Sequence, residues 1–226
     1  MLKSVIFDFD GVIADSEALH LCAFNEALAP FGMKITVEDY YKTFLGLTDA
    51  DCFRELIGKH QKIFGQTPVE TLLQNKKIAF EKLARTEATI IAGVREFLET
   101  LQANKIPMAI CSGALLPEIE LILKGGGLRD FFSAIVSAEQ VKRGKPFPDG
   151  FLLALEKLNE KTRSAIAANE CIVVEDSHWG LEAAKAAGMH TIAATNSYIA
   201  EQLSMAEKIV ARLDELTISD LQKLCG

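Results

Sequence analysis

The sequence predicts an α/β fold in which helices cover both faces of a parallel sheet. Five short apolar runs recur along the chain, and the segments between them have helical spacing. Apolar strands separated by helices are typical of parallel sheets with both faces buried. Three of the runs end at Asp8, Ser112 and Glu175-Asp176. Because ligands bind at the carboxyl ends of strands in such sheets, these residues are the first candidates for a functional site.

The predicted strands are apolar runs that stop at a polar residue or a turn. They cover residues 4–7, 108–111, 134–136, 171–174 and 191–194. The intervening segments place apolar residues on one helical face, or have strong helix-forming composition, as in residues 183–187. Gly188 is placed for a left-handed helix end, and residues 125–127 indicate another helix stop. Further helices are expected over residues 94–101, 151–158 and 213–224, and Trp179 is expected to pack its helix against the sheet.

One long stretch breaks this alternation. From about Asp15 to Thr89 we expect helices and no strand, with apolar helical faces over residues 21–31, 52–64 and 72–83. We therefore predict an α-helical domain at residues 15–90, inserted after the first strand. Residues 1–14 and 91–226 would then form a Rossmann-like core domain.

Composition narrows the possible partners. The 226 residues carry a net charge of −7, which argues against nucleic acid and, more weakly, against an anionic membrane. No apolar run reaches the roughly 18 residues that a membrane span needs. The five cysteines are scattered, with no CxxC pair and no signal peptide, so we expect reduced thiols in a cytoplasmic protein. Small phosphorylated ligands stay possible, because local charge decides their binding.

Carboxylates gather at two predicted strand ends. Asp8 and Asp10 follow the first strand, and Glu175-Asp176 follows the fourth. Several carboxylates in one buried place are costly unless a cation joins them, and oxygen ligands suit Mg²⁺. Alternatively, Asp8 and Asp10 are loop residues that cap a helix, and Asp176 or Ser177 is a helix N-cap. The capping and metal-binding roles are compatible.

Ser112-Gly113 and Lys145 are the other candidates in the predicted core. The Ser112 hydroxyl and nearby backbone N–H groups could hold phosphate oxygens, although Ser-Gly after a strand is often only a turn. Lys145 is followed by Pro146, which stiffens its loop. Lys145 would then be a cation at a crowded anionic site, or else a solvated surface charge.

Together these motifs resemble the haloacid dehalogenase superfamily. The matching residues occur in the order Asp8-Phe-Asp10-Gly11, Ser112-Gly113, Lys145-Pro146 and Glu175-Asp176-Ser177. The helical insert resembles the small cap of the β-phosphoglucomutase and phosphoglycolate phosphatase branch. The resemblance implies that Asp8 is a nucleophile that becomes phosphorylated and that Asp10 is the acid and base. It implies an Mg²⁺ ion held by Asp8, Asp10, Asp176 and Glu175. Ser112, Gly113 and Lys145 would bind the phosphoryl oxygens.

The same resemblance assigns substrate-binding roles in the cap to His20, Gly46 and Lys76. The β-phosphoglucomutases typically place an arginine just after this glycine, whereas Asp49 stands near that place here. A carboxylate would repel a second phosphate, which favours a monophosphate substrate.

We therefore predict an Mg²⁺-dependent phosphoric monoester hydrolase for small sugar or polyol monophosphates. The main alternative is a β-phosphoglucomutase-like mutase that uses the same aspartyl phosphate. A non-enzymatic phospho-acceptor and a degenerate phosphate-binding relative rank lower. The only expected partners are the small substrate and, at most, further copies in a small homo-oligomer; a monomer is equally compatible.

Overall fold

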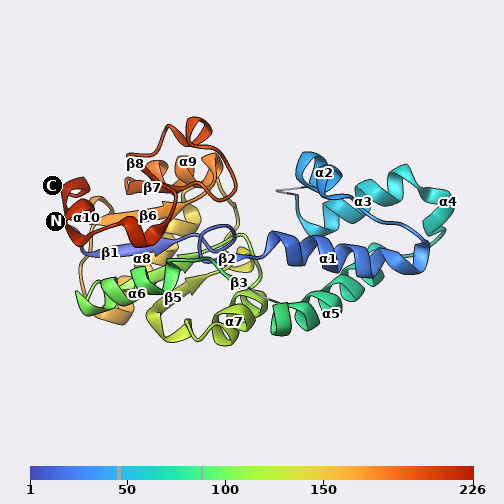
Figure 1. The fold of residues 1–226 in the computed structure, drawn as a ribbon, viewed down its shortest axis with the longest axis horizontal. Helices are drawn as coiled ribbons and strands as arrows, with labels where there is room; N and C mark the ends of the chain where they lie inside the picture. Colours follow the sequence, from blue (N-terminus) through green and yellow to red (C-terminus); the bar gives the residue numbers. More distant parts are fainter. Residues whose placement is uncertain (45–46, 88) are drawn as a thin grey trace. The chain divides into compact units, whose positions relative to one another are not determined.

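The computed structural model of the chain describes residues 1–44, 47–87 and 89–226. The chain divides into two compact units, drawn in Figure 1. We call Met1–Asp15 with Thr89–Gly226 the core domain and Ser16–Ala88 the cap domain. Each domain is described separately below.

A six-stranded sheet runs through the core domain in the order β5-β4-β1-β6-β7-β8, with every neighbouring pair parallel. Its strands are β1 Ser4–Phe7, β4 Met108–Cys111, β5 Phe132–Val136, β6 Cys171–Glu175, β7 His190–Ala194 and β8 Lys208–Val210. The five predicted strands are confirmed, and β8 is an additional sixth. Phe7 pairs with Ile110 on one side and with Val174 on the other. The ends of β1, β4 and β6 therefore meet at the centre of the sheet, which is where open α/β sheets bind ligands.

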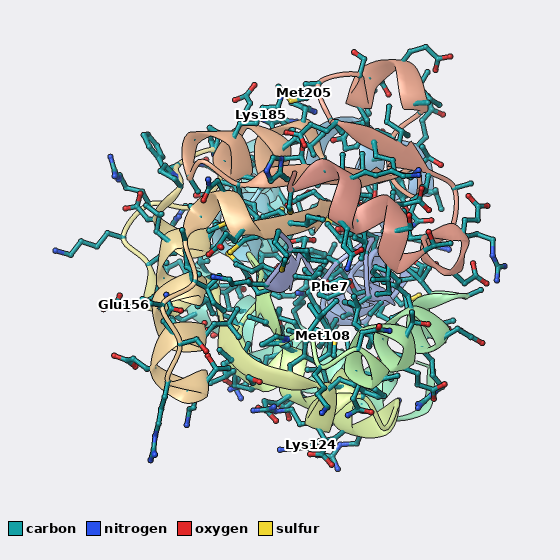
Figure 2. All side chains as sticks on the ribbon, turned by 90° about the vertical axis from the view of Figure 1, so that its left-hand side faces the viewer. Phe7, Met108, Lys124, Glu156, Lys185 and Met205 are labelled. Carbon is teal, nitrogen blue, oxygen red and sulfur yellow. The ribbon has the colours of Figure 1, made fainter. Side chains whose placement is uncertain are left out.

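Helices cover both faces of the sheet. Successive strand residues point to opposite faces, so the apolar strands need a covering layer on each side. On one face, Ile6 belongs to a buried cluster with residues of α8 (Asp149–Thr162) and α9 (His178–Ala186). Toward the other face, the Phe7 ring meets the Phe97 ring of α6 (Val94–Ala103) edge-on at 6.0 Å. Phe7 is fully buried and lies inside the core domain in Figure 2. Burying both faces explains why the strands are continuous apolar runs.

The remaining helices of the core are α7 (Leu116–Gly125) and α10 (Ile218–Leu224). The end of α7 agrees with the predicted stop, and Gly127 has a φ of 62°. The predicted terminal helix begins later than expected, because Leu213–Glu215 forms a separate 3₁₀ turn and Thr217 caps α10. The Thr217 hydroxyl accepts a hydrogen bond from Asp220 N, which fixes that start.

Two short strands lie where the chain passes between the domains. β2 (Ala14–Asp15) pairs antiparallel with β3 (Thr89–Ile90). The expectation of no strand between Asp15 and Thr89 is therefore wrong at both ends of that stretch. Two residues are too short to show an alternating pattern, so local sequence gives no sign of this pairing.

The described part of the cap domain contains helices and helical turns. They are α1 Glu17–Leu28, the 3₁₀ turn Ala29–Phe31, α2 Val37–Asp39, the π-helical segment Tyr40–Phe44, α3 Asp49–Lys59, α4 Gln61–Phe64 and α5 Val69–Glu87. The first predicted helix ends before Phe31, because Pro30 cannot continue an α-helix. The second is divided at His60 into α3 and α4. Apolar side chains from α1, α3 and α5, including Phe24, Phe53 and Leu72, form one buried cluster.

Two expectations about the whole chain can be compared with the structure. All five cysteines are free. Among the described residues, no helix has the length and apolar character that a bilayer crossing requires.

Candidate active site

Three loops at the carboxyl edge of the core sheet carry predicted catalytic or metal-binding residues. Asp8 follows β1, Ser112 follows β4, and Asp176 follows β6. The Asp8 backbone N–H donates to the carbonyl of Val174 at 2.9 Å, which continues the ladder between β1 and β6. The sheet hydrogen bonding therefore positions Asp8 beside the end of β6.

Three carboxylates converge there. Asp8, Glu175 and Asp176 are buried, and each offers one oxygen in a group whose members all lie within 4.8 Å of one another. Burial raises the pKa of Asp8 well above its usual range, and the charges of Glu175 and Asp176 add to the effect against the opposing charge of Lys145. Burial, with the charge of Glu175, raises the pKa of Asp176 to about 7. Like charges held this close favour a bound cation, and hard oxygen ligands fit Mg²⁺.

Lys145 reaches the same cluster from the loop before α8. Its Nζ donates to Asp8 Oδ1 and, at 2.5 Å, to Glu175 Oε1. Burial disfavours the charge on this lysine, but the charges of Asp8 and Glu175 outweigh burial and raise its pKa. The alternative of a solvated surface lysine is therefore excluded, because the ammonium is held between two buried carboxylates.

Glu175 is fixed by the start of α9. Its Oε2 accepts from Asp176 N at 2.9 Å, from Ser177 N at 3.0 Å and from Ser177 Oγ at 2.9 Å. A Cβ on Gly180 would lie 1.7 Å from Glu175 Oε1, so only glycine fits at that position. Ser177 is also the N-cap of α9, since its side chain accepts from Gly180 N. Of the two predicted N-cap candidates, Ser177 has that role.

Ser112 and Asp10 contact each other beside this cluster. Ser112 Oγ donates to Asp10 Oδ2 at 3.3 Å and accepts from Ala114 N at 2.9 Å. Asp10 is half-buried, unlike Asp8, which is buried. Gly113 is exposed, and a Cβ there would meet nothing within 4 Å, so packing does not require a glycine. A role for Gly113 in phosphate binding stays a prediction.

Two polar residues after β7 also reach these loops, and sequence reasoning missed both. Asn196 Nδ2 donates to the carbonyl of Gly11 at 2.8 Å, and Ser197 Oγ donates to Asp176 Oδ2. Neither belongs to a recognisable motif. The available signal was their place directly after an apolar strand, at the same sheet edge as Asp8.

The predicted cap residues that the structure describes form a cluster within the cap domain. Lys76 on α5 is 1% exposed, and its Nζ lies 2.7 Å from His20 Nδ1 and 2.6 Å from Asp49 Oδ2. Burial, with the nearby charge of Lys76, lowers the pKa of His20 to about 3, so the imidazole is neutral. Gly46 lies outside the described residues. Substrate contacts of His20, Gly46 and Lys76 stay predictions.

Trp179 does not pack its helix against the sheet, so that expectation is wrong. Its side chain is 43% exposed at the start of α9. The ring lies 3.9 Å from the His178 ring, which in turn meets the Tyr198 ring edge-on at 5.4 Å. These three rings connect the start of α9 to the segment after β7.

Comparisons with known proteins identify the family. The family model for haloacid dehalogenase-like hydrolases matches residues 5–194. The phosphorylated carbohydrates phosphatase of Thermotoga maritima is 31% identical over 195 residues, which are 84% of each chain. A Saccharomyces cerevisiae protein named as a probable pseudouridine-5'-phosphatase is 31% identical over a 232-residue alignment that covers 99% of this chain and 94% of that protein.

A solved structure shares the whole fold. CbbY from Rhodobacter sphaeroides, in complex with phosphate, matches with a TM-score of 0.83 at 24% identity, covering 98% of this chain and 100% of that one. The names of the two relatives above confirm the prediction of a phosphoric monoester hydrolase. Because the family model spans most of the chain, and the strand-end motifs stand in its fold, the chain belongs to the haloacid dehalogenase-like hydrolase family.

Proposed function

We propose that the chain is an Mg²⁺-dependent phosphatase that hydrolyses small phosphorylated metabolites through an aspartyl phosphate on Asp8. One observation carries the proposal: Asp8, Glu175, Asp176 and Lys145 converge at the centre of the sheet edge. Two relatives named as phosphatases support it.

The donor set fits a hard divalent cation. We propose that the carboxylates of Asp8 and Asp176 and the backbone carbonyl of Asp10 hold Mg²⁺. Glu175 accepts hydrogen bonds from Asp176 N and Ser177 Oγ, and we propose that it assists metal binding. When bound, the ion neutralises the carboxylates, so that an anionic phosphate can approach them.

Asp8 and Asp10 divide the chemistry between them. An Asp8 oxygen attacks phosphorus, and the bond from phosphorus to the leaving oxygen breaks while Asp10 gives that oxygen its proton. Asp10 then takes a proton from a water molecule that attacks the aspartyl phosphate. This second step releases inorganic phosphate and restores the Asp8 carboxylate. The hydrogen bond from Ser112 to Asp10 supports this role, because Ser112 is itself a proposed phosphoryl ligand.

Lys145 and Ser112 supply the remaining polar contacts. Negative charge develops on the phosphoryl oxygens during transfer, and fixed donors stabilise it without reorganising. Lys145 is held by Asp8 and Glu175, so its ammonium is in place before substrate arrives. We propose that the Ser112 hydroxyl and the backbone at Gly113 bind two other oxygens.

The substrate we propose is a small sugar or polyol monophosphate. Asp49 forms an ion pair with the buried Lys76, so the described cap cluster already balances the charge of that lysine. Such a cluster offers little attraction to a second phosphate. We assign contacts with the leaving group to His20, Gly46 and Lys76. The free cysteines support a cytoplasmic location, and we propose a monomer or small homo-oligomer.

Replacing Asp8 tests the proposal. Asp8→Asn keeps the size of the side chain but weakens the nucleophile, so hydrolysis of p-nitrophenyl phosphate should fall at least about 10³-fold. The control is Asp130→Asn, an exposed position directly before the start of β5 and so at the sheet edge opposite the site, which should retain normal turnover. Circular dichroism would check that both variants fold. Turnover near wild type in folded Asp8→Asn would exclude Asp8 as the nucleophile.

A further inference from the structure

We propose that Asn196 and Ser197 are positioning residues that set the Mg²⁺ affinity of the site. Both lie in the segment after β7, outside every motif that identified the family. The inference rests on the proposed function, since it assumes that Asp8, Asp176 and the Asp10 carbonyl hold the ion.

Ser197 holds one oxygen of the Asp176 carboxylate. Its Oγ donates to Asp176 Oδ2, and this bond restricts rotation of the carboxylate. Gly11 leaves room for this hydrogen bond, because a Cβ there would lie 1.9 Å from Asp176 Oδ2 and 2.7 Å from Ser197 Oγ. Gly11 also has a φ of 77°, a conformation that other residues rarely adopt. The hydrogen bond that orients the carboxylate therefore depends on the absence of a side chain at Gly11.

Asn196 holds the loop that carries the other proposed ligands. Its Nδ2 donates to the Gly11 carbonyl at 2.8 Å, next in the chain to the Asp10 carbonyl. The same loop is closed internally, since Gly11 N donates to Ala14 O at 2.9 Å. Fixing Gly11 from both sides limits movement of the Asp10 backbone. Asn196 and Ser197 thus hold the loops after β1 and β6 from one short segment.

That segment is itself anchored at both ends. Thr195 N donates to Val210 O at 3.1 Å, which continues the pairing of β7 with β8. On the other side, the Tyr198 ring contacts the His178 ring of α9. Because both flanks are fixed, the two side chains between them are held in place before any ion binds. Hydrogen bonds that orient ligating carboxylates typically change metal affinity by about 10–100-fold.

Ser197→Ala tests the idea by removing the hydroxyl alone. Calorimetric titration with Mg²⁺ should show a dissociation constant raised about 10–100-fold over wild type. Ser197→Thr keeps a hydroxyl and should recover most of that affinity. The matched control is Ser133→Ala, at an exposed position on the far edge strand β5, which should bind Mg²⁺ as wild type does.

Two further readouts separate positioning from a general loss of stability. Trp179 lies at the start of α9, three residues from Asp176, so its fluorescence can follow Mg²⁺ binding without substrate. With p-nitrophenyl phosphate, Ser197→Ala should lose more activity at low Mg²⁺ than at saturating Mg²⁺. A purely structural role would lower the melting temperature and leave the Mg²⁺ dependence unchanged.

The Mg²⁺ titration distinguishes failure of the positioning role from failure of the proposed function. If wild type itself binds no Mg²⁺, the proposed function fails. If wild type binds and Ser197→Ala binds within twofold of it, only the positioning role is overturned. Should Ser197→Ala not fold, Asn196→Ala decides the question in the same titration. A raised dissociation constant supports the role, and an unchanged one contradicts it.

Discussion

Asp8 and Asp10 are separated by one residue, yet their surroundings differ. Asp8 is buried against Lys145 and two carboxylates, whereas Asp10 is half-buried and contacts the Ser112 hydroxyl. The first environment favours a carboxylate whose charge is balanced by cations, and the second favours exchange of a proton with substrate or water. This contrast is the physical basis for giving the two residues different roles.

Asp10→Asn should reveal the acid role through the leaving group. A good leaving group such as p-nitrophenolate needs little protonation, so its hydrolysis should fall less than that of a sugar phosphate. We expect a difference of about 10-fold or more between the two losses, measured as kcat/KM. Equal losses for both substrates would count against Asp10 as the acid.

The raised pKa of Asp176 predicts how pH affects the magnesium-free protein. The pKa is about 7 in the fold against an ordinary value of 3.8. Between these values the folded state holds a proton that the unfolded chain has lost, so this contribution to stability is complete below about pH 4 and is lost as pH rises through about 7. In EDTA, the melting temperature of wild type should therefore fall more between about pH 5 and pH 8 than that of Asp176→Asn.

Added Mg²⁺ should reverse that loss, because the ion binds the ionised carboxylate. Ligand at about 100 times its dissociation constant stabilises by about 2.7 kcal/mol, or roughly 5–10 °C for a chain of this size. The gain should be larger at about pH 8 than at pH 5. An equal gain at both values would show that Asp176 does not titrate with metal binding.

The charged residues at the strand ends could be predicted from the sequence. The residues that orient them through hydrogen bonds could not. Asp8, Asp176 and Lys145 stand in short motifs whose chemistry can be recognised residue by residue. Asn196 and Ser197 act through hydrogen bonds to partners that lie 185 and 21 residues away in the chain. Serine and asparagine are common in loops for many reasons, so their type alone does not indicate such contacts.

At the scale of elements, the contact of α9 with β6 determines where the carboxylates lie. Gly180 permits that contact, since any side chain there would overlap Glu175. Gly180→Ala should therefore destabilise the protein by about 1–3 kcal/mol and weaken Mg²⁺ binding. Chemical denaturation and Mg²⁺ titration would measure the two effects.

Gly58 provides a matched control for that substitution. It lies in α3 of the cap, is exposed, and has open space around its Cα. Gly58→Ala should stabilise the protein by about 0.5–1 kcal/mol, because alanine is the better helix former. If Gly180→Ala were equally harmless, close packing at Glu175 would not be what fixes the site.

Strands could be predicted from the sequence where an apolar run covers enough residues to be recognised. The central strands are buried on both faces and read as continuous apolar runs, as in residues 171–174. β8 contains Lys208 and is only part-buried, while β2 and β3 have two residues each, so none shows a strand pattern. Their pairing depends on partners that local sequence does not indicate.

At the scale of the whole molecule, we propose that the core domain carries the reaction and that the cap domain selects the substrate. Asp49 and Lys76 neutralise each other within the cap, which favours hydrolysis over a mutase that must hold a second phosphate. With glucose 1-phosphate isomers as substrates, released phosphate should exceed glucose 6-phosphate at least about 10-fold, which corresponds to a difference of about 1.4 kcal/mol in barrier. Isomerisation with little phosphate release would reverse that assignment.

The central claim is that carboxylates from the ends of separate strands bind one divalent ion, while an Asp8 oxygen accepts the phosphoryl group. A crystal structure of the protein with Mg²⁺ and beryllium fluoride, which mimics a phosphoryl group on aspartate, tests it most directly. We expect the ion to contact Asp8, Asp176 and the Asp10 carbonyl, with the beryllium bonded to an Asp8 oxygen beside Lys145. An ion elsewhere, or a fluoride adduct on another residue, would contradict the account.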